Sequence, residues 1–252
     1  MRVSIITVVY NGERFIKSAI ESVLNQNYGD IEHIVIDGDS SDGTMEIINR
    51  YKDKISTIVS EPDKGLYDAM NKGLSHCTGE IVGILNADDF YKDSGVISRV
   101  VECFKEKNTQ SIYGDLIYVD QTAINKVKRY WKGGIYKRSK FLFGWMPPYP
   151  TFFVKREVYD QFGNFNIELK SAADYEFMLR VLYKHEISSY YLNETLTIMR
   201  EGGLSNSSIS NRLRGNSEDF IAWKINDIKP FFFTRFLKPL RKLKQFVGTT
   251  LF

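Results

Sequence analysis

The chain has 252 residues, of which 43% are apolar and 26% are charged, and its formal net charge is +3. This composition excludes global disorder, and so small a net charge gives no reason to expect nucleic acid as a partner. The length suits one large α/β domain, with or without a C-terminal appendage. Cys77 and Cys103 lack the spacing of a disulfide framework or a zinc site, which is typical of a reducing compartment.

The first residues predict a strand and not a targeting segment. Met1 leads directly into an apolar run without the basic start and small-residue cleavage site of a signal peptide. No run approaches the roughly 18 apolar residues that a spanning helix needs. We therefore expect a cytoplasmic protein.

The first 107 residues alternate β-rich runs with helical patterns. Strands are predicted at 3–9, 31–37, 55–60 and 80–85, and helices at 15–25, 44–51, 66–75 and 94–107. Such alternation predicts a mainly parallel sheet, because each helix returns the chain to the same end of the sheet. Right-handed crossovers then place the loops after the strands on one rim.

The rest of the chain is less regular. A strand is predicted at 111–120, followed by a basic and aromatic loop over 121–150 and a short strand at 151–155. Helices are predicted at 157–162, 172–183 and 207–225, and strands at 188–192 and 195–199. Pro230 and Pro239 argue against one long helix in the tail.

Three acidic clusters are the candidate functional sites. The first holds Asp37, Asp39 and Asp42, the second Asp88 and Asp89, and the third Asp174 and Glu176. The first two follow predicted buried strands, and ligands of open parallel sheets bind beyond the carboxyl ends of the strands. Turns also use Asp, so one such cluster would mean little.

The first cluster is a candidate base-binding site. Asp37 ends a buried strand, where its carboxylate can accept the imide N–H of a uracil or thymine ring. Asp39 is equally a turn residue, and Asp42 is a candidate N-cap of the next helix. Tyr10, at the end of the first strand, is either a stacking platform for a base or a plain core or rim tyrosine.

The second cluster, Asn86-Ala87-Asp88-Asp89, is a candidate Mg2+ or Mn2+ site. These ions prefer carboxylate oxygen and keep open positions for phosphate oxygens. Two adjacent Asp at a strand end also occur as helix caps. The buried strand before this pair and the other acidic clusters favour the metal.

Two further residues have both a functional and a structural interpretation. Lys64 lies in a turn before a predicted helix, where charge and helix dipole suit a phosphate, or it is a solvated lysine. Asp174 lies among apolar residues of a predicted helix, where a raised pKa would suit a general base. The structural alternative is a capping Asp or one paired with an arginine such as Arg180. His33, His76 and His185 have no ligand or triad spacing and are interpreted as structural.

Seven segments together resemble family 2 glycosyltransferases with the GT-A fold, most closely the bacterial branch that builds O-antigen, capsule and exopolysaccharide. They cover roughly residues 3 to 206 in the family's order. The segments are Ser-Ile-Ile-Thr-Val-Val-Tyr-Asn-Gly, Val-Ile-Asp-Gly-Asp-Ser-Ser-Asp-Gly-Thr, Glu-Pro-Asp-Lys-Gly-Leu-Tyr-Asp-Ala-Met-Asn-Lys-Gly, Leu-Asn-Ala-Asp-Asp, Pro-Thr-Phe-Phe-Val-Lys-Arg, Ala-Ala-Asp-Tyr-Glu-Phe-Met-Leu-Arg and Met-Arg-Glu-Gly-Gly-Leu-Ser-Asn.

The resemblance implies an α/β fold with a Rossmann-like, mainly parallel central sheet flanked by helices and a helical, basic C-terminal tail. Residues 1–206 would form the GT-A domain, with a nucleotide-sugar half at 1–120 and an acceptor half at 121–206. Residues 207–252 would form the tail.

The resemblance also implies site roles. Asp88 corresponds to the usual metal ligand, Asp89 to a supporting acid and Asp174 to the general base. Asn86 stands where the first Asp of the family's Asp-x-Asp motif is common, and Tyr149 stands where relatives often have His. The implied nucleotide-sugar-binding residues are Thr7, Val9, Tyr10, Asp37, Lys64, Asn86, Ala87 and Arg200, the last in a loop that often closes over the diphosphate.

The implied reaction is an inverting transfer from a nucleotide-sugar donor, a UDP-sugar, to a glycan hydroxyl in surface polysaccharide synthesis. A sugar nucleotidyltransferase is one alternative, although the first strand here is followed by Tyr10-Asn11-Gly12-Glu13 and not by a Gly-rich basic loop. A catalytically inactive sugar-nucleotide-binding module is another, against which the retention of Asp88 and Asp174 argues.

The tail interleaves aromatic and apolar residues with basic ones, and residues 240–247 fit an amphipathic helix with a cationic face. Such a helix can lie in an anionic membrane surface. The alternative is that the aromatic residues pack on the catalytic domain. A membrane-bound tail fits an acceptor carried on a polyprenyl diphosphate, as in the pathways of the resembling branch, and predicts peripheral attachment to the inner face of the cytoplasmic membrane.

Overall fold

The computed structural model describes residues 1–202, 209–243 and 245. The predicted boundary at 206/207, the end of the segment that reaches 206, and the last residues of the predicted helix 240–247 lie outside this range. Among the residues described, no helix combines the length and apolar character that crossing a membrane requires.

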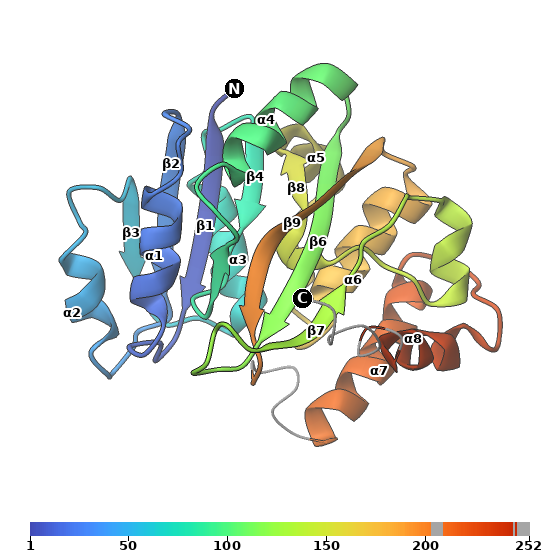
Figure 1. Cartoon of the computed structure of the whole chain (residues 1–252). Helices are drawn as coiled ribbons and strands as arrows, with labels where there is room; N and C mark the ends of the chain where they lie inside the picture. The colour runs from blue at the N-terminus through green and yellow to red at the C-terminus, as the bar shows by residue number, and fades with distance from the viewer. Residues whose placement is uncertain (203–208, 244, 246–252) are drawn as a thin grey trace.

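A single mixed sheet organises the described residues (Figure 1). Its strand order is β3-β2-β1-β4-β8-β6-β9-β5, with β7 paired to β6. Strands β1 to β4 are mutually parallel, β6 and β9 are parallel to each other, and β8, β5 and β7 pair antiparallel with their neighbours. The strands are β1 Val3–Val9, β2 Ile31–Asp37, β3 Thr57–Ser60, β4 Ile81–Ile84, β5 Asp89–Tyr91, β6 Ser111–Val119, β7 Val127–Trp131, β8 Phe153–Lys155 and β9 Ser189–Arg200.

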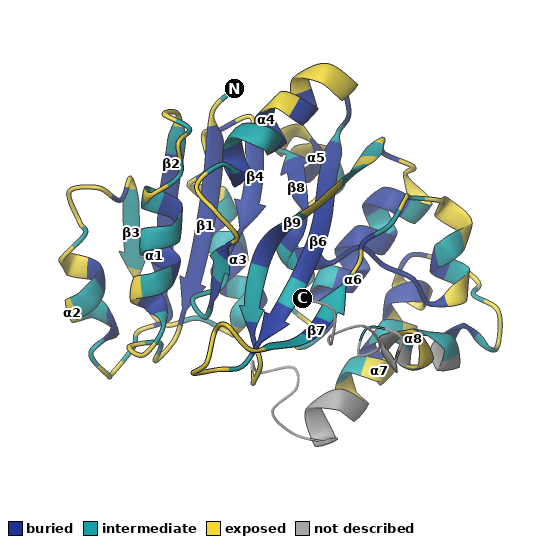
Figure 2. Cartoon of the chain, in the orientation of Figure 1, coloured by how far each residue is buried: buried dark blue, intermediate teal, exposed yellow. Residues whose placement is uncertain are grey.

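Helices cover both faces of this sheet, as expected for strands that alternate with helices. Helices α1 and α4 pack on one face, and α3 and α5 on the other (Figure 1). Strand β1 is buried along its whole length (Figure 2) because Val3 and Ile5 face the first layer whereas Ile6 and Val8 face the second. The helices are α1 Ile16–Leu24, α2 Thr44–Asn49, α3 Leu66–Ser75, α4 Val96–Lys107, α5 Arg156–Phe162, α6 Ala173–Met178, α7 Ile209–Ile225 and α8 Thr234–Leu243.

The region predicted as a loop, 121–150, contains regular structure. Strand β7 pairs with β6, and two 3-10 helices follow, η1 Arg138–Phe143 and η2 Tyr149–Thr151. The prediction was wrong here because β7 is a short strand rich in basic residues whose existence depends on pairing with β6. Its own sequence has little apolar periodicity to reveal it.

Two other predictions differ from the structure. Strand β9 is continuous where a break was predicted near Asn193 and Glu194, because a register shift between Tyr113 and Asp115 of β6 accommodates these polar residues. The helix predicted at 172–183 is α-helical only over α6 and continues as a π-helix, η3 Leu179–Lys184.

The C-terminal helices lie beside α6, at the end of the molecule away from β3 (Figure 1). Helix α7 packs on α6, and α8 packs on η1. Helix α8 begins at Thr234 and not near residue 240 as predicted, and it passes through Pro239. Phe231 and Phe233 contact the ring of Phe143, at centroid distances of 6.1 and 6.2 Å, so part of the aromatic tail packs on the domain.

Candidate active site

The carboxyl ends of β1 to β4 meet at one rim, as the parallel arrangement predicts. Asp37 ends β2 and is fully buried. Its Oδ2 accepts hydrogen bonds from the Ser60 hydroxyl at 2.7 Å and the Ser40 amide at 3.1 Å, whereas its Oδ1 has no partner in the structure. A buried carboxylate oxygen without a partner is costly, and a ligand N–H is a means of satisfying it.

The other residues predicted around the base differ in exposure. Tyr10 follows β1 and is 66% exposed, and it lies next to Gly38, just after Asp37. Val9 is buried in a small apolar cluster that Ala87 borders. Thr7 is fully buried, and its hydroxyl is 3.0 Å from Nε2 of His33. The structure thus places Tyr10 and Asp37 at the rim and Thr7 inside the fold.

The remaining acids of the first cluster tie neighbouring loops together. Asp42 accepts hydrogen bonds from the amide of Thr44, the first residue of α2, at 3.0 Å and from the amide of Glu13 at 3.2 Å. Asp39 has a positive φ of 67°, which is typical of a turn. Asp39 therefore has the turn role that the sequence offered as its alternative. Asp42 binds the first amide of α2 from one position before the N-cap, which is Gly43 and not Asp42 as predicted.

The second cluster lies between β4 and β5. Asp89 is fully buried, and one of its oxygens accepts a hydrogen bond from the Asn86 amide at 3.1 Å. The other carboxylate oxygen of Asp89 and the side-chain amide oxygen of Asn86 are buried without a partner. Burial raises the pKa of Asp88 and, together with the Asp88 charge, raises that of Asp89 well above its usual value.

These oxygens fit a hard divalent cation, which would satisfy them and offset the charge of the pair. Within the described residues no three His, Cys, Asp or Glu side chains converge on one point. A site with few protein ligands suits Mg2+ and Mn2+, which leave positions for phosphate oxygens. Asp88, which is partly exposed, and Asp89 are the residues that would hold the ion.

Arg200 is held against this cluster. It is the last residue of β9, so it lies in a strand and not in the expected loop. Its Nη1 donates to the main-chain oxygen of Asp88 at 2.7 Å, and its guanidinium lies between the rings of Phe15 and Phe90, 5.0 and 4.7 Å from their centroids. Only 8% of Arg200 is exposed, so the arginine supports the acidic turn from inside the fold.

A cavity of about 730 Å³ connects the strand ends with α6. It is lined by Asn86 on one side and by Asp174 on the other, and Tyr149 and Arg129 also face it. Tyr10 and Asp37 are not among its lining residues. The structure therefore brings Asn86, which begins the second cluster, and Asp174 to one cavity, whereas Asp88 and Asp89 are not among its lining residues and the first cluster lies at the adjoining rim.

Asp174 is half-buried in the first turn of α6. Its Oδ1 accepts a hydrogen bond of 3.0 Å from the hydroxyl of Tyr67 in α3. Burial raises the pKa of the Asp174 carboxyl, while the Lys238 ammonium and the Tyr67 hydrogen bond act in the opposite direction. The result is a carboxylate that is more basic than an ordinary Asp, as a general base requires.

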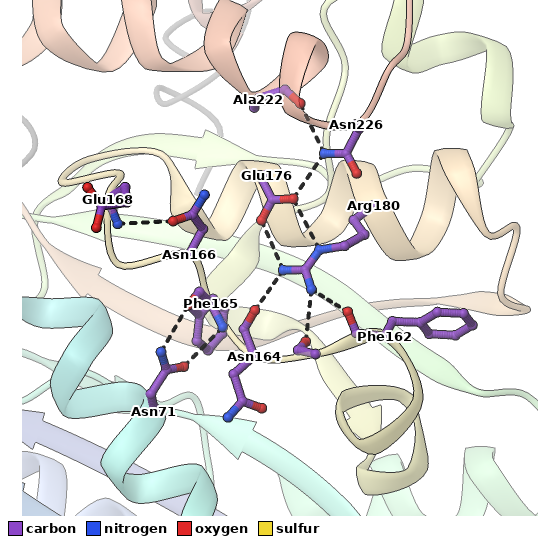
Figure 3. Close-up of polar contacts among 11 residues, drawn as sticks. Asn71, Phe162, Asn164, Phe165, Asn166, Glu168, Glu176, Arg180, Ala222 and Asn226 are labelled. Atoms are coloured by element: carbon purple, nitrogen blue, oxygen red, sulfur yellow. Dashed lines mark hydrogen bonds and ion pairs between the residues drawn. The ribbon is translucent and has the colours of Figure 1, made fainter.

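Arg180, named above as a possible partner of Asp174, instead binds Glu176 (Figure 3). It also donates to the main-chain oxygens of Phe162, Gly163 and Asn164. Asn226, the residue after α7, donates to the same Glu176 at 2.9 Å. This network fixes the orientation of α6, and with it the position of Asp174.

The start of α6 is also fixed by α7. The carboxylate of Glu218 accepts hydrogen bonds from the amides of Lys170, Ser171 and Ala172, at 3.2, 2.7 and 3.1 Å. These amides precede α6, so an acid in another helix holds the segment that leads to Asp174. Glu218 and Tyr67 were not predicted as site residues, because neither lies near Asp174 in the chain.

Lys64 is exposed just before α3. Its amide donates to the Asp68 carboxylate at 2.9 Å, and its carbonyl accepts from Lys170 Nζ at 3.3 Å. The Lys64 ammonium is thus on the surface near the start of α3. Its assignment to the donor stays a prediction.

A family model described as glycosyl transferase family 2 matches residues 4–163. The chain is 28% identical, over 210 residues, to a PGL/p-HBAD biosynthesis glycosyltransferase of Mycobacterium tuberculosis, and the match covers 82% of this chain and 80% of that relative.

Solved structures of similar shape are also glycosyltransferases. One is S. aureus TarS in complex with UDP-GlcNAc, with a TM-score of 0.70 and 18% identity over 90% of this chain and 65% of that one. Another is a mannosyltransferase from Pyrobaculum calidifontis in complex with GDP-Man and Mn2+, with a TM-score of 0.67 and 20% identity over 98% of this chain and 70% of that one. The likeness confirms the predicted α/β fold, the GT-A fold.

Proposed function

The chain is a glycosyltransferase that belongs to family 2, and we propose that it transfers a sugar from a UDP-sugar to a hydroxyl of a glycan acceptor, with inversion at the anomeric carbon. The single observation that supports this proposal most is that Asn86 of the acidic turn and Asp174 line the same cavity. A donor diphosphate bound near Asn86 and an acceptor hydroxyl bound near Asp174 would meet in this cavity. Membership of this family argues against the two alternative functions, a sugar nucleotidyltransferase and a catalytically inactive sugar-nucleotide-binding module.

The donor base would lie at the rim formed by β1 and β2. The Asp37 oxygen without a partner would accept the imide N–H of uracil, and the exposed ring of Tyr10 would stack on the base. Thr7 and Val9 would support this rim from within the fold. Lys64 would approach the phosphates from the start of α3.

The diphosphate would lie at the acidic turn. When bound there, Mg2+ or Mn2+ would neutralise negative charge on the leaving diphosphate. Asp88 and Asp89 would hold the ion, Asn86 and Ala87 would contact the donor, and Arg200 would keep the turn in place through its hydrogen bond to the Asp88 carbonyl. The Arg200 guanidinium would also add positive charge near the diphosphate.

Asp174 would act as the general base. Its carboxylate would take the proton of the acceptor hydroxyl while that oxygen forms a bond to the anomeric carbon. The bond from the anomeric carbon to the diphosphate oxygen would break in the same step, and its electron pair would leave with the nucleoside diphosphate. One displacement of this kind inverts the configuration and needs no carboxylate nucleophile.

The acceptor would be linked to a lipid, a polyprenyl diphosphate, at an anionic membrane surface in surface polysaccharide synthesis. An apolar groove of about 750 Å³ between α7 and α8 supports this part, since it shares Tyr175, Asn216, Asp219 and Lys238 with the cavity of Asp174. Phe231 and Phe232 line the groove and are 46% and 86% exposed. The protein would then be peripheral on the inner face of the cytoplasmic membrane.

The test begins with a panel of nucleotide sugars, including UDP-GlcNAc and GDP-Man, screened by thermal shift with Mn2+. With the best donor, Asp174→Asn should retain donor binding and reduce turnover by roughly 100-fold or more, the scale of a lost general base. Asp160→Asn, on the exposed side of α5, is the matched control. Weaker donor binding with normal turnover would remove Asp174 from the catalytic role.

A further inference from the structure

Two contacts attach helix α8 to the rest of the domain beside the cavity. The Thr234 hydroxyl donates to the main-chain oxygen of Leu142 at 2.6 Å, which anchors the first residue of the helix to η1. The end of η1 lies against α8 so closely that a Cβ on Gly144 would overlap the backbone of Leu237 and Lys238. Helix α8 is therefore part of the cavity wall, and its position is set by main-chain contacts.

Lys238 is the residue of α8 that faces the cavity. Its Nζ is 2.5 Å from Oδ1 of Asp219 in α7, and the two side chains are only 15% and 17% exposed. The same Nζ lies 3.6 Å from the ring centroid of Tyr175, the residue that follows Asp174 in α6. An ion pair and a cation–π contact thus hold one ammonium group over Tyr175, in the wall of the cavity that Asp174 also lines.

The groups around Asp174 come from several elements. Tyr67 of α3 donates a hydrogen bond to the Asp174 carboxylate. The charge of Asp174 raises the pKa of Tyr149 in η2 and of Tyr118 in β6, and the charge of Asp219 in α7 raises the pKa of Asp174. Lys238 is the largest of the charged influences on the pKa of Asp174 and lowers it. The ammonium therefore counteracts part of the effect of burial.

We propose that Lys238 is a positioning residue for the transfer reaction, whose ammonium, held by Asp219 and Tyr175, keeps the Asp174 carboxylate ionised and facing the acceptor hydroxyl. The inference rests on the proposed role of Asp174. It gives the tail a function in the active site that is independent of any membrane. It also explains why a basic side chain in this segment is largely buried instead of solvated.

The test is the pH dependence of turnover in full-length protein, measured as UDP release from the UDP-sugar selected by the panel, in the presence of Mn2+. Lys238→Met should move the acidic limb to higher pH, with turnover on that limb lower by roughly tenfold, as for a pKa change of about one unit. Donor affinity should not change. Lys238→Arg should restore the wild-type profile, and Lys105→Met, at an exposed lysine on α4 away from the cavity and the groove, is the matched control.

Lys238→Gln separates charge from structure, because its amide can still bind Asp219 while the positive charge is lost. It should show the same shift as Lys238→Met, and it also provides the measurement if the Met variant does not fold. An unchanged acidic limb in the Gln variant, or an equal loss of turnover at every pH, would overturn the inference. If the Lys238 inference is overturned but Asp174→Asn is inactive, the proposed function still stands. If Asp174→Asn is fully active, the assignment of Asp174 as the general base is wrong, and the inference about Lys238 is wrong with it.

Discussion

The hydroxyl of Tyr67 donates a 3.0 Å hydrogen bond to the carboxylate of Asp174, although 107 residues separate them in the chain. Tyr67 is in α3, which packs on the parallel strands β1 and β2, and Asp174 is in α6, which follows β8 and α5 in the chain. Burial and the Asp174 charge raise the pKa of Tyr67 well above 10, so the phenol stays protonated and remains a donor. The bond therefore fixes the proposed base against α3.

Tyr67→Phe should remove this alignment with little change in volume. Without the hydrogen bond the pKa of Asp174 rises further, so the acidic limb of the turnover profile should move to higher pH. Hydrogen bonds to charged groups contribute about 1.5–3 kcal/mol, so turnover on the acidic limb should fall by roughly tenfold or more. A profile identical to wild type, measured by UDP release, would show that Tyr67 only packs.

Asp88→Ala should abolish transfer in Mg2+ or Mn2+ and weaken metal-dependent nucleotide binding. The reason is that Asp88 and Asp89 supply the carboxylate oxygens of the proposed ion site. Isothermal titration with UDP, with Mn2+ and with EDTA, measures the effect. Asp53→Ala, an exposed acid after α2, is the control. Full activity of Asp88→Ala, or of wild type in EDTA, contradicts the assignment.

Asp37→Asn should weaken UDP binding by roughly 10- to 100-fold, because a charge-assisted hydrogen bond contributes about 1.5–3 kcal/mol. The change keeps the size of a side chain whose Oδ1 is buried without a partner. Asp39→Asn, in the adjoining turn, should bind UDP normally. Equal affinities of both variants would exclude Asp37 from base recognition.

His33 makes the folded protein sensitive to acid. Burial lowers its pKa from 6.5 to about 3, so the folded state holds it neutral. Above pH 6.5 both states are neutral and stability is complete; as the pH falls from 6.5 towards 3, only the unfolded state binds the proton and stability is lost. At pH 5 this loss is about 2 kcal/mol.

His33→Gln should reduce the difference between urea unfolding free energies at pH 7.5 and pH 5 by that amount, whereas His76→Gln, at an exposed site, should leave it unchanged. Equal pH sensitivity of the His33 variant and wild type would mean that other groups cause the acid loss.

Phe232→Ser should weaken binding to anionic liposomes at low salt. The ring is 86% exposed beside the apolar groove, and burying a side chain of this size contributes about 1.5–3 kcal/mol. Flotation with phosphatidylglycerol vesicles should therefore show roughly a tenfold loss. Ile124→Ser, an exposed apolar site on another loop, is the control. If the wild-type protein does not bind such vesicles at low salt, the tail has no role in membrane binding.

The amino-acid sequence alone was enough to predict the elements of the N-terminal half. Strands β1 and β2 and helix α3 have the predicted bounds, because alternating buried strands and amphipathic helices leave a periodic record in the chain. Parallel order then forces the strand ends to one rim, so the positions of Asp37 and Asp88 followed from topology.

The surroundings of Asp174 could not be predicted from the sequence, because they depend on long-range packing. The contacts of Tyr67, Glu218 and Lys238 join segments far apart in the chain, and local periodicity shows which face of a helix is buried but not which helix it meets. Strand β7 was not predicted for the same reason, because it forms through backbone pairing with β6 and its own sequence has no pattern that indicates this partner. Packing of α7 on α6, and of α8 on α7 and η1, is what places Lys238 over the ring of Tyr175, the residue after the proposed base.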